Sequence, residues 1–79
     1  MKMSKTAQTI QYLKDGDLRS ALSILKTFRY DFTREERRTI QIAYESLTGK
    51  AKFFESLGIN TQLEIEKAQK LAILKYLSH

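Results

Sequence analysis

The chain has 79 residues and no cysteine, which excludes disulfides and thiolate metal sites. Fourteen basic and nine acidic side chains give a net charge of +5, a balance that favours anionic partners. No apolar run approaches the roughly 20 residues that cross a bilayer, and no signal-peptide core follows the basic N-terminus. We therefore expect one cytoplasmic domain, residues 1–79, without a membrane partner.

The sequence contains three glycines and no proline. Gly16, Gly49 and Gly58 divide the chain into segments of helical character, because glycine is the preferred residue just past a helix end. No segment alternates with period two for more than a few residues, which argues against strands. The predicted fold is all-α: a compact bundle of four to five short helices with a longer apolar C-terminal helix.

The first two predicted helices lie on either side of Gly16. The first spans about residues 4–14, with apolar positions spaced as on one side of an amphipathic helix. The second begins after Asp17, a good N-cap, and is expected to run to Phe28. Its apolar stripe comprises Leu18, Ala21, Leu22, Leu25 and Phe28, widened by Ile24.

The third predicted helix begins at Thr33, after a connection through residues 29–32. Thr33 and Glu36 have the capping-box spacing, in which each side chain accepts a hydrogen bond from a free backbone N–H of the other residue. Thr48-Gly49-Lys50 is expected to end this helix. Its predicted core face comprises Ile40, Ala43, Tyr44 and Leu47.

Two more helices are predicted in the C-terminal part. The fourth spans residues 51–57, where Phe53 and Phe54 are adjacent, so one packs inward and the other partly outward. Thr61 and Glu64 repeat the capping-box spacing and open a last helix that reaches Tyr76 or the next residue. Apolar side chains cover most of its circumference, as in helices buried on several sides. It is either the central helix or partly an interface, such as that of a twofold homodimer.

No constellation of catalytic residues can be assembled from this sequence. The single imidazole belongs to His79, the last residue, so no serine or threonine has an obvious base beside it. Glu35 and Glu36 are adjacent and point about 100° apart, so they cannot flank one substrate. We predict no enzymatic activity, no cofactor and no metal site.

The first turn of the third helix carries a cluster of arginines: Arg34, Arg37 and Arg38. These side chains are suited to gripping phosphates or an acidic protein surface. The alternative, which we favour from the residues alone, is that they pair with Asp31, Glu35 and Glu45 around a solvated face.

Two aromatic residues precede this helix. Tyr30 and Phe32 alternate with Arg29 and Asp31, an arrangement suited to stacking on nucleotide bases. Aromatic residues in a helix–helix connection more often fill the end of the core, and we expect this role for both.

Two segments resemble known families. Residues 12–49 resemble a tetratricopeptide repeat, with Gly16 at the turn position and with Ala21 and Ala43 at small crossing positions. Gly49 follows Gly16 by 33 residues, close to the family period of about 34. This resemblance implies antiparallel helical hairpins that bind a partner. Residues 54–61 resemble the first helix and turn of a helix-turn-helix, which implies that the following helix enters the DNA major groove.

The function predicted from the sequence is noncatalytic. We expect an adaptor-like module that binds an acidic surface of another protein through Arg34, Arg37 and Arg38, with Tyr30 and Phe32 at the edge of the site. The alternative is a small DNA- or RNA-binding regulator that uses the same arginines on phosphates.

Overall fold

The computed structural model describes residues 3–77, and every regular element in that range is helical. The elements are α1 (Lys5–Lys14), α2 (Leu18–Leu25), α3 (Arg34–Glu45), the π-helical turn η1 (Ser46–Lys50), α4 (Ala51–Ser56) and α5 (Thr61–Tyr76). This confirms the predicted all-α bundle with its longest helix last. Within residues 3–77, no helix combines the length and the apolar character needed to cross a membrane.

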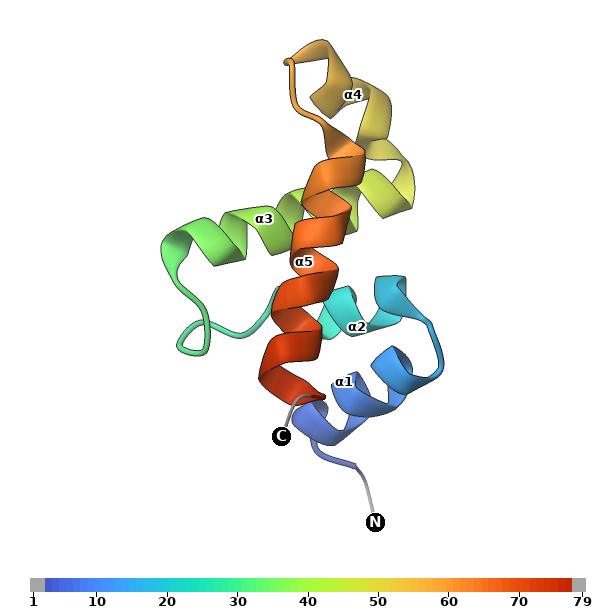
Figure 1. Cartoon of the computed structure of the whole chain (residues 1–79), viewed down its shortest axis with the longest axis vertical. Helices are drawn as coiled ribbons and strands as arrows, with labels where there is room; N and C mark the ends of the chain where they lie inside the picture. The colour runs from blue at the N-terminus through green and yellow to red at the C-terminus, as the bar shows by residue number, and fades with distance from the viewer. Residues whose placement is uncertain (1–2, 78–79) are drawn as a thin grey trace.

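Helix α5 runs along the long axis of the molecule, and the other helices pack around it (Figure 1). Ala68 and Ala72 of α5 are fully buried, and their small side chains let α3 lie close across it. Larger buried side chains from α2, α3 and the α2–α3 connection complete the core: Leu22, Leu25, Phe32 and Ile40. One face of α5 is therefore central, whereas Leu63 and Leu74 on its opposite face are exposed.

Helices α1 and α2 form a hairpin around Gly16, whose positive φ of 78° makes the turn. Asp17 caps α2 as predicted, with its side chain accepting a hydrogen bond from the Ser20 backbone N–H at 3.1 Å. The helix ends at Leu25, three residues before the predicted end at Phe28. From residue 27 the backbone N–H groups bond to carbonyls three residues back, so the chain tightens into turns there.

The capping box at the start of α3 is confirmed. Glu36 Oε1 accepts from the Thr33 N–H at 2.9 Å, and Thr33 Oγ1 accepts from the Glu36 N–H at 3.1 Å. The predicted core position of Leu47 is wrong, because this side chain is exposed and Ile42 is buried instead. Leu47 lies on the same helix face as Ile40 and Ala43, but it falls at the end of that face, just before the kink at Thr48 and Gly49 (φ 114°).

The predicted capping box at Thr61 is also wrong, because α5 begins one residue earlier. Asn60 is the N-cap, and its Oδ1 accepts from the Leu63 N–H at 3.1 Å. Asparagine and threonine both cap well, so the sequence allowed either start. The Thr61 hydroxyl is instead within hydrogen-bonding distance of Glu55 Oε1, at 3.4 Å, which links α5 to the end of α4.

Replacing the Asn60 cap tests this start of α5. Asn60→Ala should lower the free energy of unfolding by about 1 kcal/mol, because the Leu63 N–H loses its acceptor. Asn60→Gly should cost only a few tenths of a kcal/mol, since glycine tolerates the cap conformation. Urea denaturation of both variants measures the difference, and equal midpoints for Asn60→Ala and the parent would contradict the assignment.

A second pair of substitutions tests the core. Leu25 is 1% exposed, and Leu25→Ala should cost about 2–5 kcal/mol through lost burial and a cavity. Leu74 is 66% exposed, and Leu74→Ala should change the free energy of unfolding by less than about 0.5 kcal/mol. Thermal melts followed by circular dichroism compare the two, and a similar loss in both variants would show that the core is misplaced.

Candidate binding site

Three arginines of α3 line one groove together with Lys26, the residue that follows the last turn of α2. Arg34, Arg37 and Arg38 share it with Lys26 and Gln41, and its volume is about 420 Å³. We call it the cationic groove. It lies on the outer face of α3, because residues spaced three, four and seven apart share one side of a helix. The structure thus brings the three predicted arginines together and adds a lysine from the C-terminal end of α2, where it is the C-cap.

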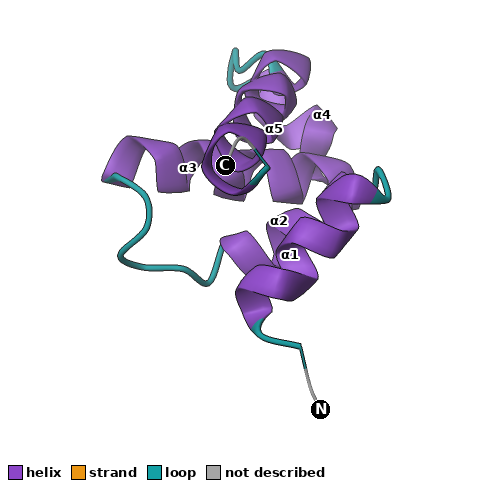
Figure 2. Ribbon diagram, turned by 60° about the horizontal axis from the view of Figure 1, so that its bottom comes forward, coloured by secondary structure: helices purple, strands orange, loops and turns teal. Residues whose placement is uncertain are grey.

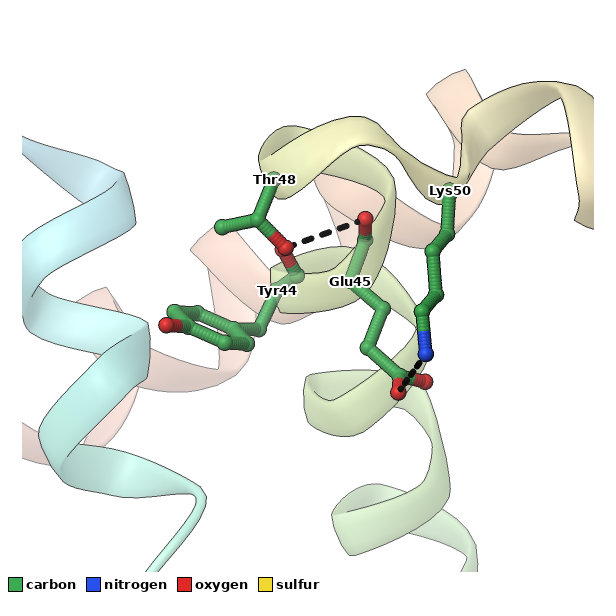
Figure 3. Close-up of polar contacts among 4 residues, drawn as sticks. All are labelled: Tyr44, Glu45, Thr48 and Lys50. Carbon is green, nitrogen blue, oxygen red and sulfur yellow. Dashed lines mark hydrogen bonds and ion pairs between the residues drawn. The ribbon is translucent and has the colours of Figure 1, made fainter.

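These four cations have no carboxylate partner in the described part of the chain. Among residues 3–77, none of the three arginines nor Lys26 has a carboxylate oxygen within 4.0 Å. Glu45, one of the predicted partners, pairs instead with Lys50, with Nζ 3.4 Å from Oε1 (Figure 3). The predicted pairing of the arginines with acidic residues of the same face is therefore wrong.

Tyr44 separates the cationic groove from a second, polar hollow. Its ring points from α3 toward α2 (Figure 3). Lys26 Nζ lies 4.5 Å from the centroid of this ring. A cation over an aromatic face is attracted to it, which holds the lysine at the wall of the groove. On the other side, a hollow of about 320 Å³ is lined by Asp17, Arg19, Ser20, Ser23 and Tyr44.

The polar groups of this second hollow are largely used within α2. Hydrogen bonding from the side chain and backbone of Ser20 lowers the pKa of Asp17. The Ser23 hydroxyl donates to the Ser20 carbonyl at 2.6 Å. Because these groups already have hydrogen-bond partners, we place the candidate site at the cationic groove. The polar hollow lies next to that site and is not part of it.

The two predicted aromatic residues are separated by the structure. Phe32 is 7% exposed and belongs to the core, where its ring packs edge-on against Tyr76 at 6.4 Å between centroids. Tyr30 is 97% exposed, so the expectation that it fills the end of the core is wrong. Figure 2 shows the connection that carries both, running outside the helices between α2 and α3. Of these two rings, that of Tyr30 is exposed to solvent.

Lys75 of α5 fixes this connection to the bundle. Its ammonium group donates a hydrogen bond to the Asp31 carbonyl and lies 4.8 Å from the centroid of the Phe32 ring. Beside it, burial raises the pKa of Tyr76, and the negative charge of Asp31 acts in the same direction. The exposed position of Tyr30 therefore follows from the anchoring of its neighbours.

Lys26 is the groove residue that sequence reasoning missed. On α2 alone it belongs to the polar side, and nothing in its local pattern indicates a site. Only the packing of α2 against α3, with Tyr44 between them, brings it beside the arginines. To find Lys26 from the sequence, one would need to know that the end of α2 packs beside α3 across the connection between them.

The groove contributes charge and hydrogen-bond donors. Each guanidinium is permanently charged and offers five N–H donors in a planar fork that matches carboxylate or phosphate oxygens. Residues 3–77 contain no group of three or more histidine, cysteine, aspartate or glutamate side chains placed to hold a metal ion. His79 lies outside the described residues.

Comparison with known proteins adds no relative. No family model, curated protein or solved structure matches the chain. The resemblances to a tetratricopeptide repeat and to a helix-turn-helix therefore rest on the residues that carry them. The function has to be argued from the groove itself.

Substitutions at the two aromatic positions test their placement. Phe32→Ala should lower the free energy of unfolding by about 3–5 kcal/mol, because a buried ring is lost from the core. Tyr30→Ala should change it by less than about 0.5 kcal/mol, as expected for an exposed side chain. Urea denaturation measures both, and a destabilisation by Tyr30→Ala as large as that by Phe32→Ala would refute the description of this connection.

Proposed function

We propose that this chain is a noncatalytic interaction module that binds an acidic segment of another protein in the cationic groove. The observation that carries the proposal is the set of four neighbouring cations without a carboxylate partner among residues 3–77. Like charges three and four residues apart destabilise a helix by about 0.2–0.5 kcal/mol per pair. Arginines in the first turn also oppose the helix dipole. A bound anion would relieve both effects.

The dimensions of the groove favour a short acidic peptide segment. From Arg34 to Gln41 the helix rises about 10 Å, which matches about three residues of extended chain. Two or three carboxylates on such a segment can accept bidentate hydrogen bonds from the guanidinium groups. The net charge of +5 would raise the association rate more than the affinity. We place this interaction in the reducing cytoplasm, because a protein without cysteine has no disulfide that depends on an oxidising compartment.

The alternative function is a small DNA- or RNA-binding regulator that uses the same arginines on phosphates. Tyr30 favours it, because this exposed ring follows Arg29 in the chain and bases stack on such rings. We rank it second because strongly salt-dependent DNA binders make about 6–10 phosphate contacts, and the groove offers four cations.

Binding of charged peptides tests the proposal. A fluorescent glutamate-rich peptide should bind at physiological salt, and a glutamine-rich peptide of the same length should not. The triple variant R34Q/R37Q/R38Q should bind the acidic peptide at least about tenfold more weakly, because charge-assisted hydrogen bonds are lost. The control K5Q/K14Q/K70Q removes the same charge from exposed positions elsewhere and should lose less than about threefold. Equal losses in the two triple variants would contradict a site at the groove.

Duplex and single-stranded oligonucleotides in the same assay decide between the two functions. We expect binding no tighter than the roughly 10⁻⁴–10⁻⁶ M of nonspecific association. Nanomolar, sequence-selective binding at physiological salt would replace the first function by the second. In that case the slope of log K against log salt should flatten by up to about three contacts in R34Q/R37Q/R38Q.

A further inference from the structure

Exposed apolar side chains gather at the α4 end of the molecule. Phe53 and Leu57 are 58% and 61% exposed, and Leu47 and Leu63 are also exposed. All four lie within residues 46–64, which form the end of the long axis farthest from α1 and α2 (Figure 1). We call this segment the α4 tip. It lies apart from the cationic groove between α2 and α3.

The short helix α4 presents these side chains outward because its other side, which carries Phe54, is buried. Phe54 is buried, and the ring of Phe53 packs edge-on against it with 5.5 Å between centroids. Leu57 follows Phe53 by four residues and so lies one turn further along the same face. The tip therefore presents an aromatic and an aliphatic side chain together, each more than half exposed.

The charge of the tip distinguishes it from the rest of the chain. Its charged residues are Lys50, Lys52, Glu55 and Glu64, two of each sign, so the tip is neutral in a chain of net charge +5. A strongly acidic or basic partner finds no net charge to recognise here. A second copy can approach through this end without net repulsion, whereas an approach through the cationic groove would bring like charges together.

We propose that the α4 tip is a self-association surface that pairs with the same surface of a second copy of this chain. A twofold axis beside α4 would place each Phe53–Leu57 pair against its mate, as in an isologous interface. This proposal moves the contact of the predicted homodimer from the C-terminal helix to the α4 tip. On the outer face of α5, Lys67 and Lys70 lie between Leu63 and Leu74, so charged side chains interrupt the apolar ones there, whereas Phe53 and Leu57 are neighbours on one face. Only the first turn of α5, with Leu63, belongs to the interface.

The small area of the α4 tip determines the expected affinity of the dimer. Stable interfaces bury about 800 Å² per partner, and four partly exposed side chains offer less. The dimer is therefore weak, with a Kd in the high micromolar range. In the dimer each copy retains its cationic groove, so two grooves can engage one acidic partner that carries two binding segments. Self-association itself needs no ligand, and it stands or fails independently of the proposed function.

Sedimentation equilibrium of the full chain, without ligand, tests the proposal from about 10 µM to about 1 mM. The weight-average mass should rise from 9.2 kDa toward twice that value. Phe53→Asp should weaken association at least about tenfold, because charge is placed in an apolar contact. Leu74→Asp introduces the same change at an equally exposed leucine outside the tip and should leave association within about twofold.

A single-cysteine experiment gives a second readout, because the chain contains no cysteine of its own. Under the same mild oxidation, Phe53→Cys should form a covalent dimer at least about tenfold faster than Leu74→Cys, which can dimerise only through random collision. This readout also serves if circular dichroism shows that Phe53→Asp does not fold. A mass of 9.2 kDa throughout the concentration range would overturn the proposal. So would association that is abolished by Leu74→Asp and unaffected by Phe53→Asp.

Discussion

The close crossing of α3 over α5 is the contact on which the rest of the bundle depends. Ala68 and Ala72 have almost no side chain, so the two helices approach until Ile40 and Ala43 fill the space between them. A larger residue at either alanine would push α3 outward, and core packing tolerates little extra volume. The position of α3 in turn determines where the arginines of its outer face meet Lys26, the C-cap of α2.

Much of the fold could be predicted because helix ends have local chemical signatures. Thr33 and Glu36 cap α3 as their spacing indicates, and Asp17 caps α2. The errors arise where the local signal allows two outcomes. Asn60 and Thr61 are both good caps; in the folded chain Asn60 caps α5, while Thr61 contacts Glu55 of α4. Leu47 continues the face of Ile40 and Ala43, and its exposure depends on where the folded core ends, just before the kink at Gly49.

The candidate site could be predicted in part for a similar reason. The spacing of Arg34, Arg37 and Arg38 places them on one face of a helix, whatever the tertiary structure. Whether those charges are neutralised depends on side-chain choices made in the folded state, where Glu45 binds Lys50 instead. Lys26 enters the site through the packing of two helices, which no local pattern records.

The kink at Gly49 has a consequence for how this sequence can vary. With φ at 114°, Gly49 has a backbone conformation that L side chains rarely adopt, although no neighbouring atom would touch an added Cβ. Substitution there is limited by backbone strain alone, since there is space for a side chain. We therefore expect related sequences to keep glycine at this position, and asparagine or aspartate to be the least unfavourable replacements. Any other residue would relax φ and swing α4 to a new direction, so one backbone angle links sequence divergence to the orientation of the α4 tip.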